Sequence, residues 1–123
     1  MEIDHDTGTV RMDWHGYAAD QVETWADKVV EAAWAQGFEY VEFVHGAGDV
    51  TARGMPGYNA AVAGRGTIKD ILRQRFFRGR WARWTRTRAQ GGHRIEESRL
   101  IIALKENPKP GKGRWPLIPP PAY

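Results

Sequence analysis

The stretch Thr9–His15, TVRMDWH, decides the fold, because its polar and apolar side chains alternate without interruption. Successive side chains of a β-strand point to opposite faces of a sheet. The apolar positions are Val10, Met12 and Trp14, and the polar positions that follow them are Arg11, Asp13 and His15. We therefore expect a half-buried strand whose polar side chains lie on the uncovered face of a sheet.

A helix and a second strand are predicted to follow this strand. Residues 18–36 carry apolar side chains at helical spacing, and Gly37 behind them suits the left-handed position after a helix. Residues Tyr40–Gly46, YVEFVHG, form a short apolar run that ends on glycine. Two strands joined by a helix make a βαβ unit, so we expect these two strands to be parallel.

The second half of the chain predicts one more helix and two more strands. Thr67 is a suitable N-cap for a helix that runs to about Phe77, and residues 80–87 and 99–106 are predicted strands with a loop between them. Residues 49–66 are rich in glycine and alanine and are predicted to form a long loop. The expected fold class is α/β: a two-layer β-α-β-α-β-β sandwich with a mixed four-stranded sheet and two helices on one face.

The predicted domain spans residues 8–106 and is flanked by two segments. Residues 1–7 are expected to be an N-terminal extension. Residues 107–123 hold six of the seven prolines, so we expect this tail to be extended or disordered, and flexible. The tail also contains a PxxP pattern at Pro116–Pro119, which is common by chance, and an adaptor function led by the tail is the weakest interpretation.

The composition excludes several classes of protein. The 123-residue chain has no cysteine, which excludes disulfides, cysteine-based zinc sites and thiol catalysis. The G-x-x-x-x-G-K-[ST], G-x-G-x-x-G and G-x-S-x-G motifs are absent. The first residues lack the basic and apolar regions of a secretory signal, and the longest purely apolar run, Leu100–Leu104, is too short to span a bilayer. We expect a cytoplasmic protein with no membrane partner.

Charge is distributed unevenly along the chain. Residues 1–50 contain eleven acidic and two basic side chains, whereas residues 51–123 contain four acidic and sixteen basic ones. Residues 69–94 alone hold eight arginines and one lysine against one acid, with aromatic side chains between them. A solvated basic face is the ordinary explanation of such a run. Arginine and aromatic side chains together, however, suit phosphates and bases, so nucleic acid is the expected partner.

Two His-Gly pairs end the two predicted parallel strands, at His15-Gly16 and His45-Gly46. Ligands of α/β proteins bind at the carboxyl ends of parallel strands. If the two strands are neighbours, Asp13, His15 and His45 are expected to converge on one rim of the sheet. One histidine at a strand end is usually structural, but two equivalent pairs favour a functional site.

These side chains suit acid–base chemistry on a phosphodiester. Two imidazoles can act as general base and general acid near neutral pH, and a carboxylate can fix the tautomer of one ring. Backbone N–H groups of Gly46-Ala47-Gly48 can hold a phosphate oxygen, because glycine allows close approach. A His/His/Asp metal site is an alternative that the spacing does not require. His5 and His93 fall in predicted loops and are expected to be structural.

The two motifs resemble those of the small MutS-related (Smr) domain family, L-D-x-H-G and H-G-x-G. Met12–Gly16 matches the first with Met in place of Leu, and His45–Gly48 matches the second. The resemblance covers roughly residues 8–106. It implies the same β-α-β-α-β-β fold, nucleic-acid binding and, in many members, endonuclease or nicking activity on RNA or DNA. The residues it implies as functional are Asp13, His15, His45, Gly46 and Gly48.

The sequence departs from the family pattern at two places. Ala47 stands where the family often has a basic residue, so Arg53 and Arg65 are the expected substitutes for a phosphate contact. The segment 49–66 is longer than the usual link into the second helix. This segment is expected to be either a substrate-contacting arm or lid, or a tolerated insertion.

The leading hypothesis is an Smr-type endonuclease in which His15 and His45 share the acid–base roles and Asp13 orients or activates. The expected phosphate or substrate contacts are Gly46, Gly48, Arg11, Arg53, Arg65, Arg73, Arg78 and Arg83. On RNA the 2′-OH can be the nucleophile and no metal is required, whereas attack by water on DNA favours a divalent metal ion. The alternative is a non-catalytic module that binds nucleic acid or the ribosome.

Overall fold

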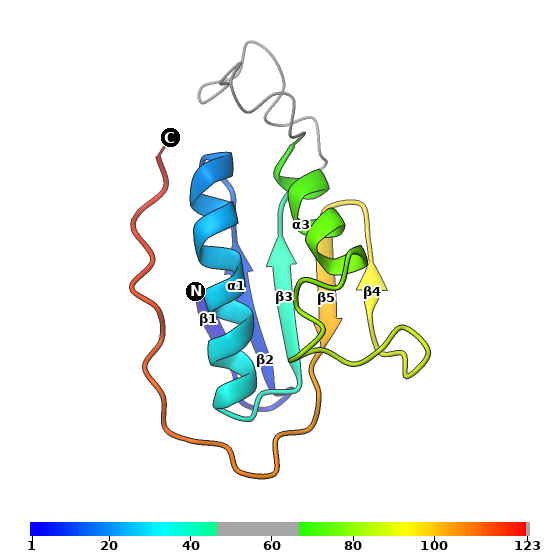
Figure 1. Ribbon diagram of the computed structural model, residues 1–123. Helices are drawn as coiled ribbons and strands as arrows, with labels where there is room; N and C mark the ends of the chain where they lie inside the picture. Colours follow the sequence, from blue (N-terminus) through cyan, green and yellow to red (C-terminus); the bar gives the residue numbers. More distant parts are fainter. Residues whose placement is uncertain (47–66, 123) are drawn as a thin grey trace.

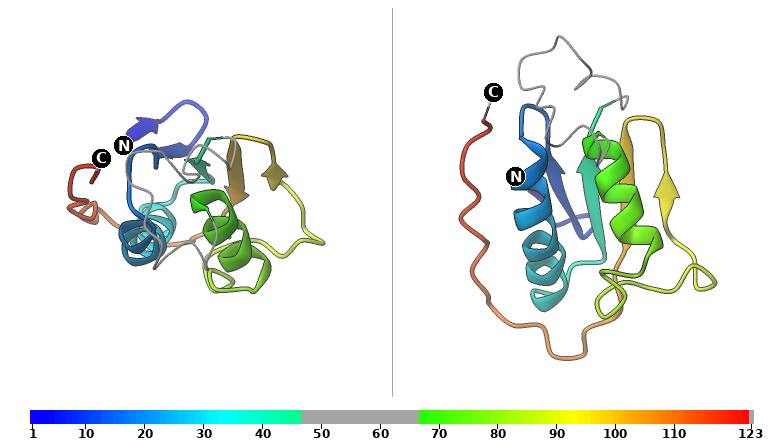
Figure 2. Two further views of the ribbon diagram at one scale, coloured as in Figure 1. Left: turned by 90° about the horizontal axis from the view of Figure 1, so that it is seen from above. Right: turned by 45° about the horizontal axis from the view of Figure 1, so that its top comes forward.

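The computed structural model describes residues 1–46 and 67–122, and its strands and helices form two layers (Figure 1). The strands are β1 (Glu2–Asp4), β2 (Thr9–Asp13), β3 (Tyr40–Val44), β4 (Arg94–Ile95) and β5 (Arg99–Ala103). The helices are α1 (Ala19–Ala35) and α3 (Ile68–Phe77). Both helices cover the same face of the sheet (Figure 2), so the predicted fold class, a two-layer α/β sandwich, is confirmed. The predicted loop 49–66 lies outside the described residues.

The sheet has five strands rather than the predicted four, in the order β1-β2-β3-β5-β4. β2 and β3 are parallel and are joined by α1, whereas the other neighbouring strands are antiparallel. The parallel register pairs Val10 with Val41 and Met12 with Phe43. All four side chains are buried in the core that the sheet shares with the helices. The predicted βαβ unit is therefore confirmed.

Aromatic side chains fill the centre of the core between sheet and helices. The rings of Trp14 and Phe43 are 5.7 Å apart, and those of Phe43 and Trp81 are 5.6 Å apart. Trp14 and Phe43 are fully buried, and Trp81 is 1% exposed. Burial of apolar surface stabilises a fold by about 25 cal/mol per Å², so these three large side chains contribute much of the core's stability.

Helix α3 begins at a capping box. The hydroxyl of Thr67 accepts a hydrogen bond from the backbone N–H of Asp70 at 3.3 Å, and the Asp70 carboxylate accepts one from the Thr67 N–H at 3.2 Å. Such reciprocal bonds satisfy backbone donors that the first turn leaves free. The predicted helix from Thr67 to Phe77 is confirmed.

The prediction of a strand at residues 80–87 is wrong. This segment folds into successive turns, in which the backbone N–H groups of Trp84 and Thr85 donate to the Trp81 carbonyl. Only Thr85 forms a β-bridge, an isolated one to Leu104. Trp81 and Trp84 lie three residues apart. This spacing places two side chains on the same side of a helical turn, whereas in a strand they would point to opposite faces.

The sheet gains its other strands from segments for which none was predicted. Residues 1–7, expected to be an extension, contain β1, which pairs with β2 through Ile3 and Val10. The segment expected to be a loop before residue 99 contains the two-residue strand β4. Both strands are short and lie at the edges of the sheet. Their pairing depends on neighbours already in place, because neither has an apolar pattern of its own.

The tail is extended, as expected, but it is packed against the domain along α1 rather than free of it (Figure 1). At the end of α1, the side-chain amide of Asn107 donates to the Trp34 carbonyl at 2.9 Å. The Trp115 ring lies 5.6 Å from that of Phe38. Near the start of α1, the Tyr17 hydroxyl donates to the Pro119 carbonyl at 2.9 Å. The tail therefore runs antiparallel to α1 over its whole length.

Replacing Trp115 by alanine is expected to lower the free energy of unfolding by roughly 1–2 kcal/mol, because the aromatic contact with Phe38 and its buried area are lost. Leu117→Ala is the matched control, since Leu117 is 91% exposed. This control should change the free energy by less than about 0.5 kcal/mol. Urea denaturation followed by circular dichroism measures both, and equal effects would contradict the docked tail.

Candidate functional site

The two His-Gly turns lie at the same end of two neighbouring strands. Asp13 pairs with Val44 in the parallel register, and the backbone N–H of Trp14 donates to the Val44 carbonyl at 2.8 Å. Gly16 and Gly46 have φ angles of 81° and 77°, a region that residues with a Cβ rarely adopt. Turning the chain at each strand end therefore explains why both histidines are followed by glycine.

Asp13 and His15 lie on the outer surface and share a cavity, here called the polar hollow. Its volume is about 310 Å³, and it is lined by Met1, Glu2, Arg11, Met12, Asp13, His15, Tyr17 and Pro121. The Asp13 carboxylate accepts the backbone N–H of His15 at 2.9 Å, which fixes the turn on which the imidazole sits. Both side chains are exposed. The hollow is thus an accessible site that contains the imidazole of His15 beside the carboxylate of Asp13.

His45 does not join this pair. It continues the buried series of Val41 and Phe43 on the helix-covered face and is only 2% exposed. Its charged neighbours, Lys69, Asp70 and Arg73, all belong to α3. The prediction that Asp13, His15 and His45 meet at one rim is therefore wrong. The two strand ends are adjacent, but the two imidazoles lie on different sides of the sheet.

The surroundings of His45 favour its neutral form. Nδ1 lies 2.6 Å from the Gly46 carbonyl, which only accepts, so Nδ1 carries the proton and donates it. Nε2 is buried without a hydrogen-bond partner among the described residues. Burial lowers the pKa of His45 below its ordinary value of 6.5. The hydrogen bond to Gly46 raises the pKa in part, whereas the cations of Arg73 and Lys69 lower it further. The side chain is therefore a poor general acid.

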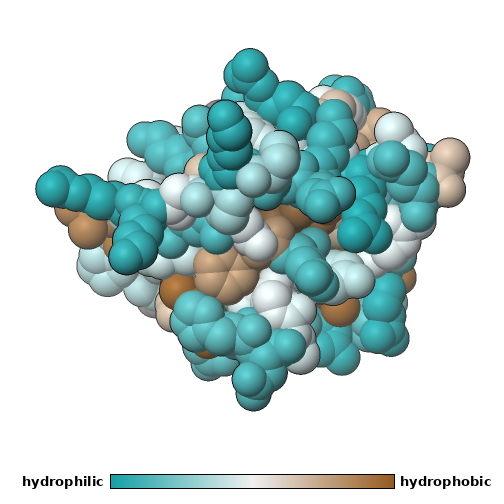
Figure 3. Space-filling model, turned by 90° about the horizontal axis from the view of Figure 1, so that it is seen from below, coloured by the Kyte–Doolittle hydropathy of each residue, from teal (hydrophilic) through white to brown (hydrophobic). Residues whose placement is uncertain are grey.

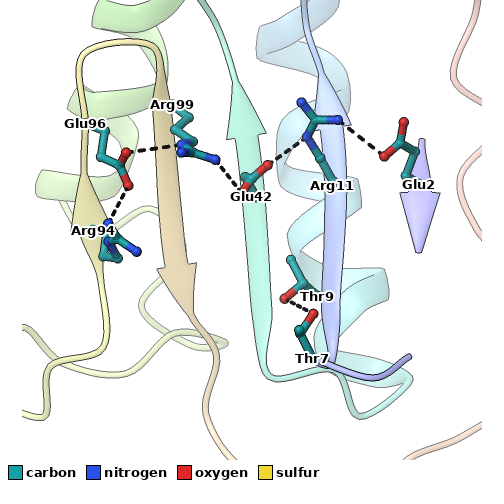
Figure 4. A network of polar contacts seen from close by, with 8 residues as sticks. All are labelled: Glu2, Thr7, Thr9, Arg11, Glu42, Arg94, Glu96 and Arg99. Carbon is teal, nitrogen blue, oxygen red and sulfur yellow. Dashed lines mark hydrogen bonds and ion pairs between the residues drawn. The ribbon is translucent and has the colours of Figure 1, made fainter. Parts of the chain in front are cut away.

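Two of the expected phosphate contacts are already engaged within the protein. The backbone N–H of Gly46 donates to the Ser98 carbonyl at 3.1 Å, so it is not free to hold a phosphate oxygen. Arg11 lies between two carboxylates, with Nη1 3.3 Å from Glu2 and Nε 2.7 Å from Glu42 (Figure 4). Hydrogen bonds to Glu2 and Glu42 raise its pKa. These contacts compete with a phosphate at both positions, and both assignments stay predictions.

Arg11 belongs to a ladder of ion pairs that crosses the open face of the sheet (Figure 4). The ladder consists of Glu2, Arg11, Glu42, Arg99, Glu96 and Arg94, in spatial order. Three acids and three bases alternate, so the ladder has no net charge. The open face is therefore unsuited to attracting a polyanion.

The remaining expected contacts have different outcomes. Gly48, Arg53 and Arg65 lie outside the described residues. Arg73 is half-buried and its Nη2 donates to the Glu96 carbonyl at 2.7 Å, so its guanidinium is tied to the structure. Arg78 and Arg83 are exposed and line a common cavity. Among the predicted arginines that the structure describes, these two share a cavity.

This second cavity, here called the basic groove, has a volume of about 740 Å³ and is formed by α1, α3 and the turns that follow α3. Its lining residues are Glu23, Asp27, Ile71, Gln74, Arg75, Arg78, Arg80, Arg83 and Trp84. Four arginines face two carboxylates, so the groove has a cationic surplus. Sequence patterns did not single out Asp27, Arg75, Arg80 or Trp84 as a group.

Asp27 holds the groove together. Its carboxylate accepts hydrogen bonds from Arg75 Nη1 at 3.2 Å, from Arg80 Nε at 2.8 Å and from the indole N–H of Trp81 at 2.7 Å. Arg78 and Arg83, by contrast, have no ion pair with any described residue. Arg75 and Arg80 thus build the wall of the groove, and Arg78 and Arg83 carry its uncommitted charge.

The basic groove and the polar hollow are separate places. The turns after α3, which line the groove, are bonded to β5: the N–H of Arg86 donates to the Ala103 carbonyl. Ala103 pairs with Tyr40, so these turns lie at the amino end of β3. The hollow lies at the carboxyl end of β2, beside Asp13 and His15. The end of the molecule where α1 ends is covered mostly by hydrophilic side chains, with small apolar areas between them (Figure 3).

Within residues 1–46 and 67–122, no three His, Asp or Glu side chains are grouped so that they could hold a metal ion. None of the helices found in these ranges has the length and apolar character needed to cross a membrane. Comparison of the chain with protein-family models, curated proteins and solved structures gives no match.

The lowered pKa of His45 predicts a specific loss of stability in acid. Below the ordinary pKa of 6.5, the unfolded chain binds a proton that the folded protein rejects. The His45 contribution is therefore fully present above this pH and is lost as the pH falls, by up to about 1.4 kcal/mol per pH unit.

His45→Asn keeps a donor for the Gly46 carbonyl and removes the titrating ring. Urea unfolding between about pH 5 and pH 8 should show a shallower pH dependence for this variant than for the wild type. Parallel pH profiles for the two proteins would contradict the buried neutral histidine.

Proposed function

We propose that this protein binds nucleic acid and that the basic groove holds the phosphate backbone. The observation that carries the proposal is the pair Arg78 and Arg83, two exposed cations without a carboxylate partner among the described residues, in a groove that Trp84 also lines. Arginine presents a planar fork of donors that matches phosphate oxygens. The phosphates of a nucleic acid in this groove can therefore bind the guanidinium groups of Arg78 and Arg83.

The charge of the groove favours a polyanion over a single small anion. Two more arginines without an ion pair in the described part of the chain, Arg86 and Arg88, follow in the same segment. Each phosphate that meets a cation releases condensed counterions, so affinity increases with the number of contacts and falls with salt. The neutral ladder on the open sheet face offers no comparable attraction.

The double variant Arg78→Gln/Arg83→Gln tests this proposal. It is expected to weaken binding of a labelled oligonucleotide by at least about tenfold and to reduce the slope of log affinity against log salt by about 2. Fluorescence anisotropy over a series of salt concentrations measures both quantities.

Lys109→Gln/Lys112→Gln is the charge-matched control, because both lysines are exposed in the tail. It removes the same net charge and should leave the slope nearly unchanged. If the control and the groove variant weaken binding equally, the attraction comes from overall charge and the basic groove is not the site.

Phosphodiester cleavage at the polar hollow is the second candidate function. The observation that favours it is the shared exposure of Asp13 and His15 on one turn, with the His15 N–H bonded to the Asp13 carboxylate. The Smr-like motif around these residues points to the same chemistry. His15 would take the proton of an RNA 2′-OH, the 2′-oxygen would bond to phosphorus, and the 5′-oxygen would leave with a proton from solvent.

Asp13→Asn and His15→Gln are expected to abolish cleavage of labelled RNA while leaving binding in the groove intact. Asparagine keeps an oxygen that accepts the His15 N–H, so the turn persists while the negative charge is lost. Asp6→Asn, in the turn between β1 and β2, is the control. RNA and its 2′-deoxy counterpart are compared with and without EDTA. Cleavage that survives both substitutions would exclude this site.

A further inference from the structure

Two aromatic rings, Trp84 in the basic groove and Phe77 at the end of α3, each lie against an arginine on one side and against core residues on another. The Arg83 guanidinium carbon lies 5.6 Å from the centre of the Trp84 ring, and that of Arg88 lies 4.9 Å from the centre of the Phe77 ring. Phe77 is 45% exposed and is one of the few large apolar side chains on the surface. Trp84 is half-buried and lines the groove. Both rings therefore offer a face to a planar group.

The segment that carries these rings is held firmly. The Thr85–Leu104 bridge and the bond from the Arg86 N–H to the Ala103 carbonyl fix it to the end of β5. Beyond it, His93 Nε2 lies 2.9 Å from the Arg86 carbonyl, while Nδ1 accepts the Ala103 N–H at 3.0 Å. Figures 1 and 2 show the segment leaving α3 and looping beside the sheet. Because the backbone of this segment is already fixed, binding of a ligand costs little conformational entropy of the backbone.

We infer that the preferred ligand is a single-stranded nucleic acid, whose unpaired bases stack on Phe77 and Trp84 while Arg78, Arg83 and Arg88 bind its phosphates. This inference rests on the proposed function and specifies its substrate class. RNA and DNA share the necessary chemistry, an anionic backbone with exposed base faces, and are distinguished by the experiment below.

The arginine–aromatic pairs explain how both contacts form together. A base that takes the place of a guanidinium over a ring keeps the ring covered by a planar group and frees the cation for a phosphate. In a duplex the base faces are stacked on one another, so only the phosphates would remain to be bound. Discrimination against a duplex follows from the rings, whereas affinity for any polyanion follows from the arginines.

The test compares four ligands of about ten nucleotides at one salt concentration: single-stranded RNA, single-stranded DNA of the same sequence, the DNA duplex, and an abasic single strand. The full chain is used throughout, and anisotropy gives the affinities. Both base-containing single strands should bind at least about tenfold more tightly than the abasic strand and the duplex. A difference between RNA and DNA identifies contacts to the 2′-OH.

Variants separate stacking from charge. Phe77→Leu keeps an apolar side chain but loses the aromatic face, and it should weaken binding of base-containing strands about fivefold without affecting the abasic strand. Phe77→Trp should restore the affinity. Ile95→Ala is the matched control, because Ile95 is 43% exposed on β4, outside the groove. Trp84→Leu repeats the test at the second ring, with circular dichroism to verify folding.

The outcomes distinguish this inference from the proposed function. Tight binding of base-containing strands, weakened about fivefold in Phe77→Leu and restored in Phe77→Trp, supports the inference. Equal binding of the abasic strand, the duplex and the single strands overturns it and leaves nucleic-acid binding in place. No binding of any ligand overturns both.

Discussion

The helix layer depends on the hydrogen bonds that the carboxylate of Asp27 accepts from Arg75, Arg80 and Trp81. Trp81 fills the core with 1% exposure, and its indole N–H would be an unsatisfied buried donor without Asp27. The charge of Asp27, 23% exposed, is in turn neutralised by Arg75 and Arg80. One carboxylate of α1 thus fixes α3, the following turns and the tryptophan between them. The basic groove has its shape because these contacts hold its walls.

The alternation of the strands is the second constraint, and it decides which histidine is accessible. The parallel register pairs Val10 with Val41, so the inward positions are even-numbered in β2 and odd-numbered in β3. His15 follows the outward series and His45 the inward one. The buried neighbours Val41 and Phe43 already carry this information in the sequence. The two imidazoles do not converge because the strand ends are adjacent whereas the two positions differ in parity: His15 continues the outward side of β2, and His45 continues the inward side of β3.

Features encoded locally were predicted well from the sequence. The strand at Thr9, the helix that ends before Gly37 and the capped helix at Thr67 all follow from spacing and capping over a few residues. Features that depend on distant partners were not: Asp27 meets Arg75 and Trp81 across 48 and 54 residues. The prediction of a strand at residues 80–87 was wrong for the same reason. The burial of Trp81 against α1 imposes turns on a segment whose sequence alternates locally.

The division of charge along the sequence does not persist in space. Acids of the first half of the chain bind arginines of the second, as Asp27 does with Arg75 and Arg80 and as Glu42 does with Arg99. These pairs cancel much of the asymmetry and neutralise the open sheet face. After α3, Arg78, Arg83, Arg86 and Arg88 remain without ion pairs to the described residues. Two of them, Arg83 and Arg88, lie against the rings of Trp84 and Phe77. A basic segment in a sequence thus indicates a binding surface only where the fold leaves its charges unpaired, and here the fold does so at one end of the helix layer.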